Sequence, residues 1–391
     1  MNKLLSFLAI SLCAAACIYP YTPDLEEAPE GVLSVDGNIC IGEISTVLLG
    51  QLYSLWPSEP GSAPSIYNDP RFQTESTRVW VEDDQGKQYP GVSDVYGGYL
   101  GSFTIDTREA PMDRRYRLHI EALGNVYTSD WSDLLEPPVI KDIQFDADAQ
   151  NVHVSVSLDG GTDGTGYMVL NYDETWEFHV DYPVAFIVDP VSWQITALES
   201  PDYDRYWCWR SNKDAMNHLV DYSAISDNGV TGYRLLSFPR MDDRNHRRYY
   251  INVKARTVSA KTYRFLKNLE ENTNGGDNLF TPEPGEIGGN LHCESDPERT
   301  VLGYVLFSKT VSKRAFLNSR YLRSSPPATL LYLLPDKYPE HYARDYRPLV
   351  QRMDPAPDPS MGPFGWGSRR CYDCLAAGGT QKLPSFFDEM E

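Results

Sequence analysis

Residues 77–89 read TRVWVEDDQGKQY, and Val79 and Val81 alternate with polar or half-polar neighbours. A strand with one buried face shows this period of two, and the residues Asp-Gln-Gly that follow supply a turn that reverses the chain. Patterns of this kind at short, regular spacing are typical of an antiparallel sandwich of immunoglobulin-like size. We therefore expect such a domain over residues 32–136, and the stretches that carry it are 31–41 (GVLSVDGNICI), 46–55 (TVLLGQLYSL), 98–105 (GYLGSFTI) and 116–129 (YRLHIEALGNVYTS).

A second sandwich is expected over residues 137–320. Pro137 and Pro138 separate it from the first, because paired prolines stop both a helix and a strand ladder. Period-two alternation then returns in four stretches, 139–147, 151–160, 167–180 and 249–258.

Three further segments complete the expected organisation. An insertion over 183–248 is longer than a connecting loop. Ser259 is placed to cap a helix over 259–273, and residues 321–391 are rich in proline and glycine. The predicted fold class is mainly β, with two immunoglobulin/fibronectin-like β-sandwich domains, a short helix and a long coil C-terminal region that contains a Cys-x-x-Cys pair.

The first 16 residues have the pattern of a signal peptide, with Lys3 before the apolar run Leu4–Leu12 and small residues before Cys17. Cleavage before Cys17 would expose a thiol and an amine for acylation, and two or more acyl chains anchor a protein stably to a membrane. Ordinary secretion without lipidation is the alternative. Residues 17–31 combine prolines with acids and are expected to form a lipidated tether.

The formal net charge is −20 and the pI is about 4.7. A surface of this charge repels phosphate backbones and anionic lipid surfaces. Nucleic acid is therefore excluded as a partner, and the expected contact with the membrane is the lipid on Cys17.

The cysteines are read as disulfide candidates, since thiols outside the cytoplasm oxidise. Zinc is disfavoured because no second Cys-x-x-Cys pair accompanies Cys371 and Cys374, and thiol exchange is disfavoured because the pair follows a loop rather than opening a helix. Cys40 lies in a strand pattern and is expected to be a buried free thiol. The disulfide candidates are Cys208, Cys293, Cys371 and Cys374.

No catalytic motif, metal site or cofactor site is recognised, and the chain is expected to be non-enzymatic. Glu174 and Glu177 could suggest a glycosidase pair, but a spacing of three on a strand places them on opposite faces. Aromatic residues in the insertion are the ligand-binding candidates, because their faces stack on sugar rings and peptide side chains. Packing is the equally weighted alternative for these candidates, which are Tyr203, Tyr206, Trp207 and Trp209.

The order of several motifs resembles the Bacteroidota outer-membrane lipoproteins classed as domain of unknown function 4249. These motifs run from Cys17 through LSVDGNI, the Cys208–Trp209 pair, GEIGGNLH and VLGYVLFS to the final Cys-x-x-Cys. The resemblance implies an outer-membrane lipoprotein, lipid-anchored at the cell surface, that assists a TonB-dependent transporter in nutrient capture; an adhesive or structural protein that binds host glycan or matrix is the alternative. The residues that match the family pattern are expected to be structural: Cys208, Trp209, Gly289, Asn290, Gly303, Cys371, Cys374 and Pro384.

Overall fold

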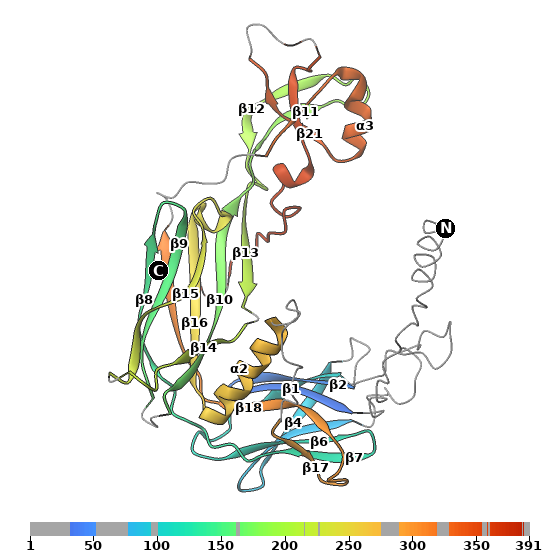
Figure 1. Cartoon of the computed structure of the whole chain (residues 1–391). Helices are drawn as coiled ribbons and strands as arrows, with labels where there is room; N and C mark the ends of the chain where they lie inside the picture. Colours follow the sequence, from blue (N-terminus) through green and yellow to red (C-terminus); the bar gives the residue numbers. More distant parts are fainter. Residues whose placement is uncertain are drawn as a thin grey trace, which may run out of the picture.

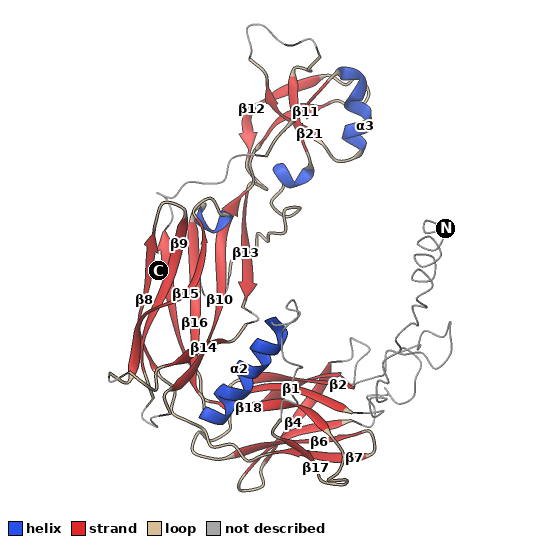
Figure 2. Cartoon of the chain, in the orientation of Figure 1, coloured by secondary structure: helices blue, strands red, loops and turns tan. Residues whose placement is uncertain are grey.

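Strands dominate the computed structural model of this chain, and they form two sandwiches and a small distal unit (Figures 1 and 2). Figure 1 shows this distal unit, the head, at the end of the second sandwich that lies away from the N-terminal one. The predicted mainly β fold with two sandwiches is confirmed. The expected signal peptide, Cys17 and the tether fall outside the described residues, which are 32–51, 77–94, 101–161, 165–214, 216–225, 227–274, 289–318, 328–353, 358, 360–384 and 386.

The N-terminal sandwich is one path of nine strands whose two halves share a core. The strand β4 (Gln88–Asp94) joins the halves, because its first residues pair with β3 (Arg78–Asp83) and its last with β5 (Gly101–Asp106). Buried and exposed residues alternate along β3 and β5 as the sequence predicts. The other strands are β1 (Leu33–Cys40), β2 (Ile44–Gln51), β6 (Tyr116–Ala122), β7 (Asn125–Ser129), β17 (Leu291–Cys293) and β18 (Val301–Ser308).

Two strands of this sandwich come from a distant part of the sequence. β17 pairs with β7, and β18 lies parallel to β1 with Leu33 opposite Val301. Both strands lie within residues 137–320, the range expected for the second sandwich, so that boundary is wrong for them. Alternation reveals that a stretch is a strand but not which strand it pairs with, so a parallel partner this far along the chain leaves no local signal.

The second sandwich packs two sheets around a core of their inward-facing residues. One sheet has the order β13-β10-β16-β19, with β14 also paired to β10, and the other has the order β15-β9-β8. Tyr249 and Val253 are fully buried between the sheets. The strands are β8 (Val139–Ala147), β9 (Asn151–Asp159), β10 (Tyr167–His179), β13 (Trp207–Lys213), β14 (His218–Asp221), β15 (Gly229–Pro239), β16 (Arg248–Thr257) and β19 (Val311–Asn318).

The helix α2 (Ala260–Asn274) bridges the two sandwiches (Figure 1). Ser259 caps it as expected, because the hydroxyl of Ser259 accepts a hydrogen bond from the Thr262 amide at 3.1 Å. One turn of the helix faces both domains: Tyr263 stacks on Tyr167 of β10 at 4.6 Å, and Phe265 stacks on Tyr304 of β18 at 4.4 Å.

The head combines part of the expected insertion with the C-terminal region. The hairpin of β11 (Val184–Val188) and β12 (Ile195–Asp202) packs against a sheet in which β22 (Phe364–Gly367) lies between β20 (Leu331–Leu333) and β21 (Arg347–Gln351). The helix α3 (Tyr338–Ala343) covers the buried Trp366 through the ring of Tyr338.

The head shows that the expected boundaries need two changes. The insertion 183–248 is not one unit, because β11 and β12 belong to the head while β13, β14 and β15 belong to the second sandwich. The C-terminal region contains long coil as expected, but it also carries β20, β21, β22 and α3. Elements of three to six residues are too short to show a clear period in a sequence rich in proline and glycine.

Candidate functional site

The neck is the junction where the head meets the second sandwich, and it is joined by backbone hydrogen bonds. The Tyr182 amide donates to the Cys371 carbonyl at 3.0 Å, and the Cys374 amide donates to the Arg205 carbonyl at 2.9 Å. Trp209 and Thr380 exchange two hydrogen bonds, at 2.7 and 2.8 Å. The C-terminal segment therefore extends the exposed edge of β13, which satisfies backbone groups that an edge strand leaves open.

A disulfide fixes this segment covalently. Cys208 of β13 bonds to Cys374, 166 residues further along the chain, with their Cα atoms 5.7 Å apart. Cys371 and Cys374 are therefore not bonded to each other. Cys293 and Cys371 were also disulfide candidates, and for these two residues the prediction is wrong, because both are buried free thiols. Cys371 lies in the 3-10 turn η7 (Arg369–Cys371) with its sulfur 3.6 Å from the Ser368 hydroxyl, while β13 faces Cys374. Cys40 is free as expected, although only partly buried.

Three of the four predicted aromatic residues meet at the neck. Tyr203 contacts Tyr206 edge-on at 5.2 Å, and Tyr206 in turn contacts Trp207 at 5.6 Å. His179, at the end of β10, stacks on Tyr206 at 4.9 Å and meets Trp207 edge-on. Only Tyr203 is more than half exposed, so these rings chiefly pack the neck and offer a single open face to a ligand.

Trp209, the fourth candidate, does not join the other three. It is 7% exposed and its ring centroid lies 6.1 Å from that of Tyr250, further along the same sheet. Tyr250 also contacts Phe316 at 4.9 Å and Phe386 at 5.4 Å. Trp209 therefore belongs to an aromatic row on the outer face of the sheet.

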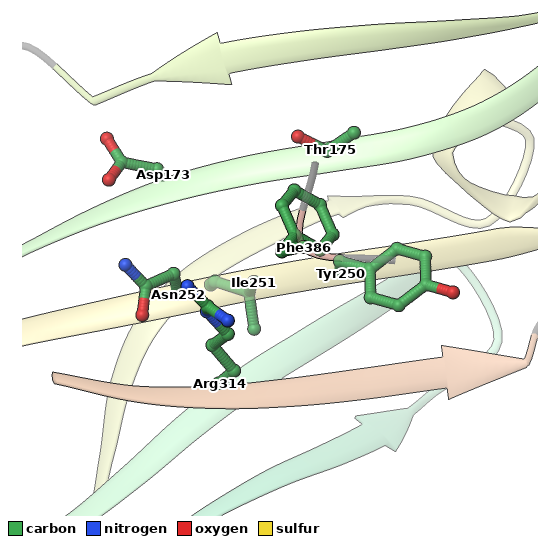
Figure 3. Close-up of a pocket in the computed structure, with 7 residues that line it drawn as sticks. All are labelled: Asp173, Thr175, Tyr250, Ile251, Asn252, Arg314 and Phe386. Atoms are coloured by element: carbon green, nitrogen blue, oxygen red, sulfur yellow. The ribbon is translucent and has the colours of Figure 1, made fainter. Parts of the chain in front are cut away.

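Figure 3 shows the pocket beside this row, a recess of about 230 Å³. Asp173 and Thr175 come from β10, and Phe386 lies over the sheet next to Tyr250. Arg314 of β19 lies 5.7 Å from the Phe386 ring, within the range of a cation–π contact. The C-terminal segment that the disulfide anchors thus returns to form one wall of this pocket.

A partly buried histidine, His246, packs against the neck. The His246 ring stacks on His179 at 4.2 Å, and its Nδ1 accepts a hydrogen bond from the His179 amide at 3.1 Å. Burial, followed by the nearby His179 ring, lowers the pKa of His246 to about 4. His246 is therefore neutral at pH 7, its proton is on Nε2, and Nε2 has no partner among the described residues.

Glu174 and Glu177 serve as structural carboxylates. Glu174 is 1% exposed and accepts two hydrogen bonds from Arg244, at 2.8 and 3.0 Å, and a third from the Tyr249 hydroxyl at 2.8 Å. Glu177 pairs with Arg247 at 3.0 Å. Asn212 donates a further hydrogen bond to Glu174 at 2.9 Å, so both of its carboxylate oxygens are engaged by neighbouring side chains and it anchors the sheet.

A recess at the neck lies between the β12–β13 turn and the C-terminal segment, with a volume of about 430 Å³. Residues from both segments line it, together with Val184 of β11. We name it the neck pocket, and its walls are Val184, Asp202, Asp204, Arg205, Asp345, Arg347, Arg369, Tyr372 and Asp373.

Asp373 organises the charges of the neck pocket. Its side chain is 4% exposed and accepts hydrogen bonds from Arg205 and Arg369, both at 2.9 Å, and from the Leu375 amide at 3.0 Å. Burial alone would raise the pKa of Asp373, but the hydrogen bonds from Arg369 and Arg205 outweigh it and the pKa lies below its usual value. Asp345 bridges Arg369 and Arg347 at 3.4 and 3.2 Å.

The neck pocket has no signal in the sequence that marks it as a whole. Asp204 and Arg205 lie among the predicted aromatic residues, so part of one wall was within reach. The opposite wall comes from residues 345–373, and no spacing in the sequence relates them to residue 205. Only the Cys208–Cys374 disulfide joins the two segments, and a connectivity cannot be read from a sequence.

Three residues of the expected family pattern have structural roles at the β1–β18 pair. Gly303 has a φ of +111°, and a Cβ there would overlap the Val35 carbonyl; a Cβ on Gly289 would overlap the carbonyl of Gly303. The buried side-chain amide of Asn290 donates a hydrogen bond from Nδ2 to the Val305 carbonyl, and its Oδ1 accepts one from the Val305 backbone N–H, both at 2.8 Å. These residues let a distant segment pack closely against β18.

No group of three or more metal-ligating side chains is present in the part of the chain that the structure describes, and none of the helices described there is long and apolar enough to cross a membrane.

No curated protein matches the sequence. One matching solved structure is the crystal structure of selenomethionine-substituted chicken interferon gamma receptor alpha chain, at 12% identity. The match covers 58% of this chain and 89% of that chain, and its TM-score is only 0.16. The model of one family covers most of the sequence, residues 18–314. The chain therefore belongs to the family described as Domain of unknown function (DUF4249).

Proposed function

We propose that this protein is a non-enzymatic lipoprotein of the cell envelope, anchored to the outer membrane through Cys17, that faces the cell surface and assists a TonB-dependent transporter in nutrient capture. The observation that carries the proposal is the disulfide-anchored head with the neck pocket at its base. A capture protein needs a preformed recess, because ordering a loop at the moment of binding costs affinity.

The position of the head supports this role. Figure 1 shows the head at the far end of the second sandwich, away from the N-terminal sandwich that follows the tether. A lipid on Cys17 would hold the N-terminal sandwich near the membrane, and the two sandwiches would carry the head outward. The Cys208–Cys374 disulfide suits an oxidising compartment.

Co-purification tests the proposal. The full chain with a C-terminal affinity tag is recovered from detergent-solubilised outer membranes, beside a Cys17→Ala variant and a Cys40→Ala variant as the matched cysteine control. We expect the wild type and Cys40→Ala to recover a TonB-dependent transporter, and Cys17→Ala to leave the membrane fraction. Recovery of the wild-type chain alone, or membrane retention of Cys17→Ala, would contradict the proposal.

A further inference from the structure

We infer that the neck pocket binds a small zwitterion of the free amino acid or short peptide class, with the ligand carboxylate on Arg205 and Arg369 and its ammonium group at Asp202 and Asp204. The inference rests on the proposed capture function and names its ligand class. Four features of the neck pocket support this ligand class: its rigid construction, its cationic wall, its anionic wall and its balance of positive and negative charges.

The neck pocket is rigid by construction. The Cys208–Cys374 bond and the hydrogen bond from the Cys374 amide to the Arg205 carbonyl fix its two walls against each other. Its volume of about 430 Å³ lies in the range of small-molecule sites. A ligand therefore enters a recess whose polar groups are already in position.

The cationic wall has hydrogen-bonding capacity to spare. Asp373 binds Arg205 through one nitrogen, Nη1, and binds Arg369 through Nε, so one buried carboxylate orients two guanidinium groups. Arg369 also contacts Asp345 through Nη1 at 3.4 Å. Each guanidinium carries five N–H groups, and the described residues engage only one or two of them. The remaining donors suit a carboxylate, which arginine binds in a two-pronged geometry.

The anionic wall lies on the β12–β13 turn. Asp202 and Asp204 are exposed, and neither forms an ion pair with any residue that the structure describes. One oxygen of Asp202 accepts a hydrogen bond from the Asp204 amide at 2.8 Å, which holds the turn and leaves its second oxygen open. A primary ammonium group has three donors and would bridge two such carboxylates.

The balance of charge disfavours other small ligands. Three arginines and four aspartates line the neck pocket, so a simple anion meets four carboxylates and a simple cation meets three guanidinium groups. A neutral sugar would need an open aromatic face, but the only aromatic wall residue, Tyr372, is partly buried and donates its hydroxyl to the Asp345 carbonyl at 3.2 Å. A ligand with one charge of each sign satisfies both walls.

Isothermal titration calorimetry on the full chain in detergent tests the inference with three probes. Ala-Ala carries both charges, Ala-Ala amide lacks the carboxylate, and N-acetyl-Ala-Ala lacks the ammonium group. We expect the wild type to bind Ala-Ala at least tenfold more tightly than either blocked form, because each lost charge removes a charge-assisted hydrogen bond.

Two variants assign the walls. Arg369→Gln should abolish the preference for Ala-Ala over its amide, and Asp204→Asn should abolish the preference over the acetylated form. Arg234→Gln on β15 and Asp296→Asn between β17 and β18 are the matched charge controls, and both should keep the wild-type preferences. Circular dichroism checks that each variant is folded.

Three outcomes would overturn the inference: no binding of Ala-Ala by the folded wild type, equal binding of the three probes, or loss of preference in the control variants. These results are independent of co-purification with a transporter. If the chain co-purifies with a transporter but does not bind Ala-Ala, the proposed function stands and the ligand class is wrong. A chain that binds Ala-Ala but recovers no transporter keeps the ligand class and loses the partner.

Discussion

Removal of the Cys208–Cys374 disulfide should destabilise the neck more than any loss of a free thiol. The change is the double variant Cys208→Ser/Cys374→Ser. The bond closes a loop of 166 residues, and the entropy that such a cross-link removes from the unfolded chain corresponds to about 5 kcal/mol at 25 °C. Measured losses for native disulfides are commonly about 2 to 5 kcal/mol, so we expect the effect to lie in that range.

Urea unfolding followed by tryptophan fluorescence is the assay. The chain has eight tryptophans, and two of them, Trp207 and Trp209, flank Cys208, so the part of the emission change that differs between the wild type and the disulfide variants reports on the neck. A chain with several cores need not unfold in one step, and the neck transition is therefore compared by its midpoint and slope. The double variant should unfold at a lower urea concentration, and the wild type with reductant should shift toward the same midpoint.

The control variants identify the bonded pair. Cys208→Ser and Cys374→Ser should each cost as much as the double variant, because either change removes the whole bond. Cys371→Ser should leave the transition almost unchanged, since Cys371 is a free thiol in η7. A larger loss in Cys371→Ser than in Cys208→Ser would refute the assigned connectivity, and so would full additivity of the two bonded cysteines.

Two further predictions test the packing of the chain. Gly303→Ala should disrupt the β1–β18 pair, because the added methyl group overlaps the Val35 carbonyl. Gly86→Ala is the control: Gly86 has a φ of +82° and open space around it, so this change should cost only about 1–2 kcal/mol of backbone strain. Limited proteolysis of the N-terminal sandwich compares the two variants, and equal resistance would contradict the predicted overlap. His246 has a folded pKa of about 4 against an ordinary 6.5, so between these values the unfolded chain binds a proton that the folded chain does not, and stability should rise with pH. His246→Asn keeps an acceptor for the His179 amide and should flatten that rise in urea unfolding series from pH 4 to pH 6.5; an unchanged slope would show that another group is responsible.

The sequence was sufficient for the local structure and insufficient for the long-range pairs. The alternation in residues 77–89 correctly predicts β3 and the turn into β4, because one buried face imposes a period of two, but most of β4 (Gln88–Asp94) lies beyond that stretch. The Ser259 cap and α2 were predicted within one residue, since a cap is a contact between near neighbours. The partner of β1 was not predictable, because β18 satisfies the same alternation in either sandwich.

The candidate site shows the same division. The sequence drew attention to the stretch that contains Arg205, but by its aromatic rings, which mostly pack the neck. The charged groups that make the neck pocket are individually ordinary surface residues. They become a site only because Asp373 is buried beside Arg205 and Arg369, and this depends on a disulfide between residues 166 positions apart.

The shared construction links the disulfide to the ligand. Both walls of the neck pocket belong to the segments that Cys208 and Cys374 join, so a ligand that touches both walls holds the same two segments together. Binding to the folded state alone adds stability that grows with ligand concentration, about 2.7 kcal/mol at 100 times the dissociation constant. This is comparable to the loss expected for Cys208→Ser/Cys374→Ser. Saturating Ala-Ala should therefore return much of the urea midpoint of that variant, while Ala-Ala amide should return little. A variant that binds Ala-Ala without any shift in the neck transition would show that the ligand sits elsewhere on the chain.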